Sequence, residues 1–173
     1  MIENERDIRL SSVIEAGRRM LTAARTAPKA KGLDLLECCL VTGDDIQRMS
    51  AEMQCLYEET GRPVFKRDGE NILKAGCVVV IATRREAMGL DCGHCGFDSC
   101  AQKLPGVPCA FNSVDVGIAL GSAVATAADC RVDTRVMYSA GMAAARMKLL
   151  GEGAYQYFAI PVSASSKSPF FDR

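Results

Sequence analysis

The sequence predicts one α+β domain, and three observations lead to this fold class. Its 173 residues suit a single domain with a sizeable buried core. Segments with helical periodicity and short apolar runs typical of strands both occur along the chain. They do not alternate regularly, as the strands and helices of a doubly wound sheet do. No repeat or linker interrupts residues 1–173, so the whole chain is treated as the domain.

The first half of the chain predicts two helices and two strands. Apolar residues three and four apart place a helix at about residues 7–27, which Pro28 ends. Residues 33–42 are largely apolar and are predicted to form a buried strand. Residues 76–82 contain a β-branched run typical of a central strand covered on both faces. Between the strands, a helix begins at Asp44 and closes at Gly61, and residues 66–71 form a polar connection leading to a short turn of helix.

The second half predicts two further helices and two strands. Asn112 or Ser113 caps a helix that runs to about residue 128, on which two glycines four residues apart permit close packing in the core or in a dimer. A strand at 133–138, a helix at 139–150 and a strand at 154–162 follow. The polar end carries Phe170 and Phe171, which either fray or dock on the body or a partner subunit.

Composition excludes several classes of function. The chain has 21 basic and 21 acidic residues, so no net charge attracts it to nucleic acid. Its longest apolar run, residues 116–128, is shorter than the roughly 20 residues that a membrane span needs. Nine cysteines without a secretory signal predict free thiols in a reducing cytoplasm. The single histidine, His94, excludes histidine-rich metal sites.

One short stretch carries a specific chemical pattern. Four cysteines follow one another with the spacing C-x2-C-x4-C-x8-C inside a glycine-bearing loop at residues 90–110. A [4Fe-4S] cluster needs four thiolates around it, and glycines let the backbone bend and bring its amides towards the cluster sulfurs. The candidate metal ligands are therefore Cys92, Cys95, Cys100 and Cys109.

Two other readings of the loop stay open. Structural zinc is the main rival to the cluster, although such sites usually combine two separated C-x2-C pairs and this loop has only one. Metal-free thiols are the third possibility. No residue is assigned a catalytic role, because His94 has no orienting partner in the pattern.

Residues 92–102 resemble the four-cysteine motif of electron-transfer iron–sulfur proteins. In that motif the fourth cysteine lies further along the chain than Cys109 does here, so Cys77 and Cys130 are alternatives for the fourth ligand. With residues 129–139 and the terminal Pro-Phe-Phe-Asp-Arg, almost the whole chain resembles a family of uncharacterised prokaryotic proteins described as containing a ferredoxin domain.

The scaffold has a second, weaker resemblance, to flavin-dependent nitroreductases. Residues 23–32, 73–82 and 115–121 fall in the order of that family's flavin segment, central strand and dimer helix. The resemblance implies a mixed sheet flanked by helices, a homodimer and bound FMN, with Arg25, Lys29, Lys31 and Gly32 as the cofactor-binding residues. The family's serine is replaced here by Lys29, its flavin-contacting asparagine by Gly32 and its glutamine by Asp34.

These observations predict an iron–sulfur redox protein. It would carry electrons or form part of an oxidoreductase, and its partner would be a redox protein or a small-molecule electron acceptor. The alternatives are an FMN-dependent, nitroreductase-like reductase and a zinc-stabilised binding or sensor module.

Overall fold

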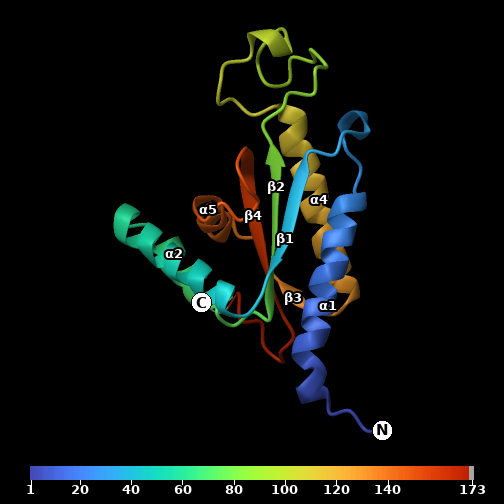
Figure 1. The fold of residues 1–173 in the computed structure, drawn as a ribbon, viewed down its shortest axis with the longest axis vertical. Helices are drawn as coiled ribbons and strands as arrows, with labels where there is room; N and C mark the ends of the chain where they lie inside the picture. The colour runs from blue at the N-terminus through green and yellow to red at the C-terminus, as the bar shows by residue number, and fades with distance from the viewer. Residues whose placement is uncertain (172–173) are drawn as a thin grey trace.

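A computed structural model describes residues 1–171 of the chain and has a sheet between two layers of helices (Figure 1). The elements, in chain order, are α1 (Glu5–Thr26), the short η1 (Ala30–Gly32), β1 (Leu36–Val41), α2 (Asp44–Thr60), α3 (Pro63–Ile72), β2 (Cys77–Arg84), the short η2 (Cys100–Gln102), α4 (Ala110–Asp129), β3 (Asp133–Thr134), α5 (Tyr138–Arg146) and β4 (Ala154–Ser163). The predicted α+β class is confirmed.

The sheet has the strand order β1-β2-β4-β3, with β2 and β4 at its centre. Every pairing between these four strands is antiparallel, where the sequence predicted a mixed sheet. The β-branched run of β2 is buried over seven of its eight residues, as expected for a strand covered on both faces.

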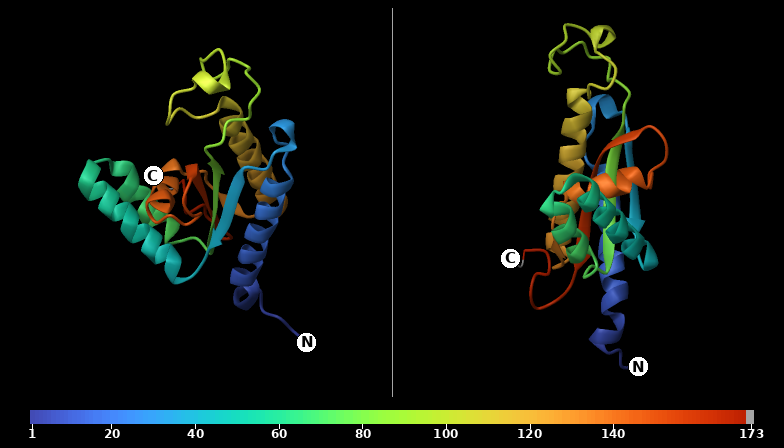
Figure 2. Two further views of the ribbon diagram at one scale, coloured as in Figure 1. Left: turned by 45° about the horizontal axis from the view of Figure 1, so that its top comes forward. Right: turned by 90° about the vertical axis from the view of Figure 1, so that its left-hand side faces the viewer.

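The two faces of the sheet bury separate cores. Helices α1 and α4 cover one face and share a core with Cys77, Val79 and Ile81 of β2. Helices α2, α3 and α5 cover the other, packing against Val78 and Val80. Figures 1 and 2 show these layers on opposite sides of the sheet. Alternate residues of one strand therefore hold the two helical layers together.

Three predicted elements differ from the structure. The polar connection at 66–71 belongs to α3, whose Pro63 stands in the first turn and whose Asp68 is buried and accepts a hydrogen bond from Ser139 Oγ. Helix α4 begins before the predicted caps, with Cys109 as its N-cap residue. The strand predicted at 133–138 stops at Thr134, because α5 begins at Tyr138.

Helix α4 is long and apolar enough to cross a membrane when judged by length and composition alone. In this fold its Ala119, Ala123 and Ala127 are fully buried in the core shared with α1. The same helix exposes Val114 and Ile118 on another face. Burial of one face of α4 in the core thus explains part of the high hydropathy of this helix.

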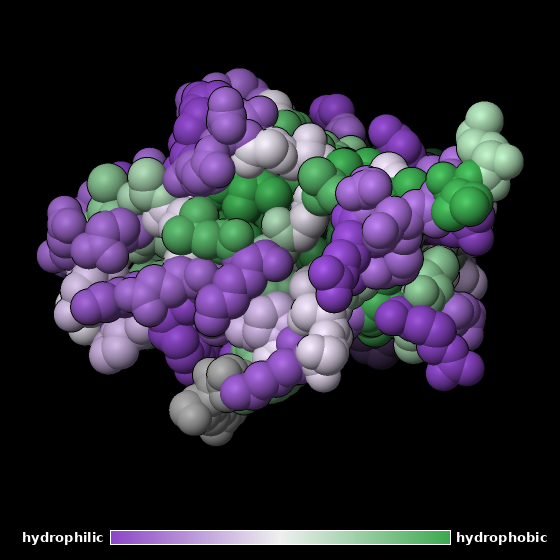
Figure 3. Space-filling view, turned by 90° about the horizontal axis from the view of Figure 1, so that it is seen from below, coloured by the Kyte–Doolittle hydropathy of each residue, from purple (hydrophilic) through white to green (hydrophobic). Residues whose placement is uncertain are grey.

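The C-terminal tail docks on its own chain. Phe170 is fully buried in the core formed by α2, α3 and α5, and its carbonyl accepts a hydrogen bond of 2.7 Å from the Arg135 guanidinium. Phe171 remains exposed, with the same guanidinium 5.1 Å from its ring centroid. Seen from the end of the molecule opposite the cysteines, hydrophilic side chains border the hydrophobic ones (Figure 3).

The two phenylalanines allow a matched test of this docking. Phe170→Ala should lower the free energy of unfolding by about 3–5 kcal/mol, because it leaves a cavity in a packed core. Phe171→Ala should change it by less than about 1 kcal/mol, since the ring is exposed. Urea denaturation followed by circular dichroism measures both values. Equal losses for the two variants would mean that the tail does not dock as described.

Candidate metal centre

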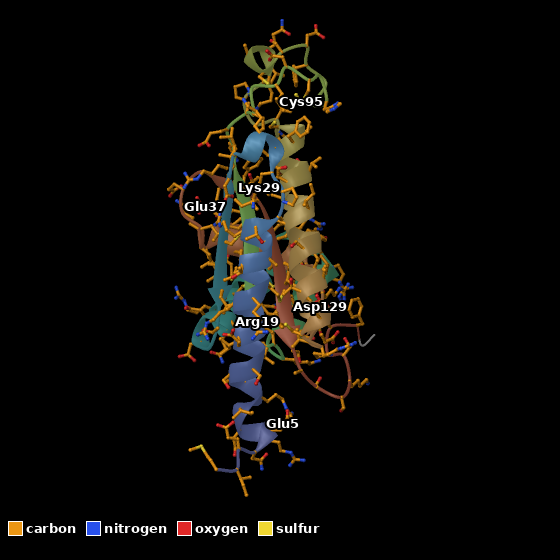
Figure 4. All side chains as sticks on the ribbon, turned by 90° about the vertical axis from the view of Figure 1, so that its right-hand side faces the viewer. Glu5, Arg19, Lys29, Glu37, Cys95 and Asp129 are labelled. Carbon is orange, nitrogen blue, oxygen red and sulfur yellow. The ribbon has the colours of Figure 1, made fainter. Side chains whose placement is uncertain are left out.

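The candidate site is the connection between β2 and α4, residues 85–109, called the cysteine loop below. It projects from one end of the molecule, beyond the sheet and the helical layers (Figure 1). Cys95 lies in this loop, at the end remote from Glu5 and Asp129 (Figure 4). Because the loop leaves a central strand and enters a 20-residue core helix, rigid elements fix both of its ends.

All four predicted ligands line one pocket within the loop, called the cysteine pocket below. Cys92 is exposed, Cys95 and Cys100 are half-buried, and Cys109 is buried at its base. The walls between them come from other residues of the loop, Met88 among them, and from the first turn of α4. The space inside is only about 10 Å³, which is roughly the room for one water molecule. The loop would therefore open to enclose a four-iron cluster.

The loop backbone is built to bend. Gly93 and Gly96 have φ angles of 70° and 85°, which other residues rarely adopt, and a hydrogen bond of 2.9 Å joins the Gly96 amide to the Gly93 carbonyl. Asp91 also has a positive φ, of 44°, and its carboxylate accepts a hydrogen bond of 2.6 Å from the Cys100 amide. These turns fold the first three cysteines around the pocket.

Cys109 differs from the other three because it belongs to a helix. It is the N-cap residue of α4, and its carbonyl accepts a hydrogen bond from the Ser113 amide at 3.3 Å. The first amides of a helix carry partial positive charge, and they favour anionic groups placed at that end. An anionic group held at the base of the pocket would lie close to these amides.

Asn112 joins the two ends of the cysteine loop. It is fully buried in the first turn of α4, and its side-chain amide donates to the carbonyl of Arg84 at 3.0 Å and to that of Glu86 at 2.7 Å. The sequence pattern identified Asn112 only as a candidate helix cap. Bonds of a side chain to carbonyls 26 and 28 residues away leave no local pattern from which the role could be read.

The basic loop between α1 and β1 supports the cysteine loop from the side. Buried Asp115 of α4 accepts the Ala30 amide on both carboxylate oxygens, each at 3.1 Å. Lys31, held at a φ of 56°, donates its ammonium group to the Met88 carbonyl at 3.0 Å. The segment that resembles a flavin-binding segment therefore contacts the wall of the cysteine pocket.

The other residues predicted to bind FMN have partners within the chain. Arg25 forms an ion pair of 2.7 Å with Asp34 and also donates to the Leu36 carbonyl. Lys29 donates to the carbonyls of Ala24 and Arg25 at the end of α1. Gly32 has a φ of 67° and shapes the turn. Of the four residues predicted to bind FMN, Lys31 is thus the one with a hydrogen bond to the cysteine loop, and the charges of Arg25 and Lys29 are already engaged by oxygen atoms.

The alternative fourth ligands lie far from the pocket. Cys77 begins β2, and the length of that strand, about 23 Å, separates it from the start of the loop. Cys130 follows α4, roughly 30 Å along the helix from Cys109. Burial also raises the pKa of the Cys77 thiol to about 12. Among the candidates for the fourth position, Cys109 alone lines the pocket.

Within the described residues, no group of three or more His, Cys, Asp or Glu side chains is arranged to hold a single metal ion. The cysteines surround the pocket instead of meeting at one point. His94 points its ring towards Phe111 of α4, with the ring centroids 5.6 Å apart, so it packs against the base of the loop.

Sequence comparison identifies a family model for the C-terminal part of the chain and a relative that covers its whole length. The model of the family described as "Uncharacterized protein containing a ferredoxin domain" matches residues 105–173, which include Cys109 but not the other three cysteines of the loop. An uncharacterised protein of Archaeoglobus fulgidus is 37% identical over 183 aligned positions, which cover 100% of this chain and 98% of the relative.

Structure comparison gives the same fold as the scaffold resemblance. A nitroreductase from Desulfitobacterium hafniense with bound FMN superposes with a TM-score of 0.62 and 15% identity, covering 88% of this chain and 78% of its own. The nitroreductase CinD from Lactococcus lactis, in complex with chloramphenicol, gives 0.63 and 15%, covering 96% and 81%. At these identities the likeness establishes a nitroreductase-like fold.

Thiol reactivity should separate Cys77 from the surface cysteines. A pKa of about 12 leaves roughly one Cys77 thiol in 10⁴ ionised at pH 8, so iodoacetamide should barely modify it in the native, iron-free protein. Its reaction rate should rise about tenfold per pH unit as long as the fold persists, because alkylation needs the thiolate. Peptide mass spectrometry measures this, with exposed Cys55 as the reference. Equal rates at the two sites would contradict the burial of Cys77.

Proposed function

Because the chain belongs to the family of proteins described as containing a ferredoxin domain, we propose that it is an iron–sulfur redox protein. Its cofactor is one [4Fe-4S] cluster held by Cys92, Cys95, Cys100 and Cys109. The observation that carries this proposal is that the four thiols of the motif line one pocket at the end of a rigid scaffold.

The donor set suits the group. When bound, such a cluster supplies single-electron transfer at a potential that depends on hydrogen bonds to its sulfurs and on its burial. The chain's part is to hold four thiolates, three on bending backbone and one at the buried start of α4. The positive end of that helix offsets negative charge in the pocket. Asn112 and Lys31 keep the ends and wall of the loop in place.

Zinc has less support than the cluster. A structural zinc ion takes four ligands at about 2.0–2.3 Å from a single point. In the described residues no such convergent group exists, and the loop has one C-x2-C pair. The cluster is favoured by the cysteine spacing, because four thiols in one glycine-bearing loop with a single C-x2-C pair are the donor set of an iron–sulfur motif.

A reductase that also binds FMN is the second candidate. Its support is the fold shared with an FMN-bound nitroreductase, together with the contact between Lys31 and the wall of the cysteine pocket. In this reading FMN lies beside Arg25, Lys29, Lys31 and Gly32. Phosphate binding there requires Arg25 or Lys29 to exchange its present carboxylate or carbonyl partner for the ligand.

We also propose that two copies of the chain associate through α4. Val114 and Ile118 are 50% and 40% exposed on this helix, and a methyl group added at Gly117 or Gly121 would meet open space. An uncharged, glycine-bearing helix face permits close approach of a second helix.

The redox partner is a protein or a small-molecule acceptor. The compartment is a reducing cytoplasm, which suits a chain with nine cysteines and no disulfide in its described residues.

Iron content tests the cluster directly. Anaerobically purified protein should be brown and contain about four irons per chain. Cys100→Ser and Cys109→Ser should each lower the iron content severalfold, because each removes one thiolate from the pocket. Plasma emission spectrometry measures iron and zinc together.

Cys130→Ser is the matched control, because Cys130 lies outside the pocket, and it should keep the full iron content. Stoichiometric zinc in place of iron, or normal iron in Cys109→Ser, would contradict the proposed ligands. Flavin released on heating the same preparation would support the FMN reading, and its absence after incubation with FMN would count against it.

The α4 interface predicts an effect of charge on oligomeric state. Ile118→Glu should weaken self-association by about 2 kcal/mol or more, roughly 30-fold, because a carboxylate would be buried between two helices. Leu73→Glu, at an exposed apolar residue outside α4, should leave the dimer intact. Sedimentation equilibrium distinguishes a dimer from the 18.6 kDa monomer. Wild-type protein that sediments as a monomer would refute the interface.

A further inference from the structure

A strained residue interrupts β4 beside the root of the cysteine loop. Ile81 of β2 pairs with Phe158, but Thr83 pairs with Tyr155, so β4 carries one extra residue in a β-bulge. Gln156 lies in this bulge with a φ of 53°. Glycine or asparagine would adopt that conformation at lower cost. Bulges often re-aim a side chain next to a binding site, and strain of this kind marks positions where the side chain has a task.

The Gln156 side chain is only partly paired. Its Nε2 donates to Ser113 Oγ of α4 at 2.7 Å, whereas its Oε1 is buried without a hydrogen-bond partner. The fully buried Asn112, one residue before Ser113, likewise has a buried and unpartnered Oδ1. A buried carbonyl oxygen without a donor is costly, so it calls for a group that completes it.

Gln156 lines an open groove of about 450 Å³, a size typical of small-molecule sites. We call it the tyrosine groove, because it collects three of the four tyrosines in the chain. Its walls come from the first residue of the cysteine loop, from α5 and from β4. The lining side chains used below are Arg85, Tyr138, Tyr155, Gln156, Tyr157 and Phe158.

Charge and aromatic surface complete the groove. The Arg85 guanidinium lies 5.4 Å from the ring centroid of Tyr155. Among the described residues no carboxylate forms an ion pair with it. A guanidinium over a tyrosine, with a free edge for a carboxylate, recognises planar acids. Tyr155 also reaches the root of the cysteine loop, since its hydroxyl lies 3.5 Å from Asn112 Nδ2.

We propose that the tyrosine groove binds a planar heteroaromatic acid with a lactam edge, meaning a ring N–H beside a ring C=O. Because Oε1 is closed off from the groove in the free protein, binding turns the Gln156 amide towards the groove. The lactam N–H then donates to Oε1, and the adjacent C=O accepts a proton of Nε2. The carboxylate pairs with Arg85, and the ring lies against the tyrosines. This inference rests on the proposed function only for the role of the ligand, which is to be the small-molecule partner of the redox centre.

Calorimetric titration with three probes tests the site. Orotate has both the lactam and the carboxylate, uracil has the lactam alone, and benzoate has the carboxylate alone. Orotate should bind at least about tenfold more tightly than either, because each missing group leaves one protein partner unpaired. Arg85→Gln should weaken orotate and benzoate but leave uracil unchanged. Absence of orotate binding at about 1 mM, where weak specific ligands are still detected, would overturn the proposal.

Gln156→Asn separates binding from folding. Asparagine tolerates the left-handed conformation but its amide is one carbon shorter, so orotate affinity should fall about tenfold while Tm stays within about 2 °C. The control is Lys148→Asn, since Lys148 has a similar φ of 51° and lies outside the groove. It should change neither value. A fall in Tm with unchanged affinity would assign Gln156 a structural role instead. Because binding needs no iron, these results stand apart from the test of the cluster.

Discussion

The hydrogen bonds of Asn112 are the constraint on which the site depends. A loop of 25 residues that carries four thiols would have many conformations if its ends were free, and closing it has an entropic cost. Asn112 holds the end of β2 against the first turn of α4, so the loop starts and finishes at two fixed points. Since the amide is fully buried, water does not compete for these bonds. The loop then needs only glycine turns of its own to bring the cysteines around one pocket.

The same end of the molecule gathers segments that are distant in the sequence. Asp115, one turn after Asn112, holds the basic loop that follows α1, and Lys31 of that loop reaches the wall of the cysteine pocket. On the other side, Gln156 of β4 bonds to Ser113. Helix α4 is therefore the common support of the cysteine pocket, the basic loop and the tyrosine groove. The nitroreductase-like fold of this chain thus carries the cysteine loop between β2 and α4.

Local patterns in the sequence predicted much of this arrangement. The β-branched run of β2, the periodic apolar residues of α1 and the cysteine spacing all reflect interactions that recur at short intervals along the chain. Helix α3 escaped prediction because Asp68 and Asn71 turn inward, where Ser139 from α5 pairs with the carboxylate. Asn112 and Gln156 were missed for a related reason. Their partners lie tens of residues away, and the bulge at Gln156 depends on how β4 pairs with β2.

The burial of Phe170 has a consequence for how the protein is made. Strand β4 is central in the sheet, and Phe170 completes the core beneath α2, α3 and α5, yet both come from the last fifth of the sequence. While a ribosome is still translating the earlier segments, β2 has only one of its two neighbouring strands and an open strand edge. The sheet and this core can therefore be completed only after residue 170 has emerged. Interrupted translation would release chains with exposed apolar surface, which are natural substrates for chaperones and proteases.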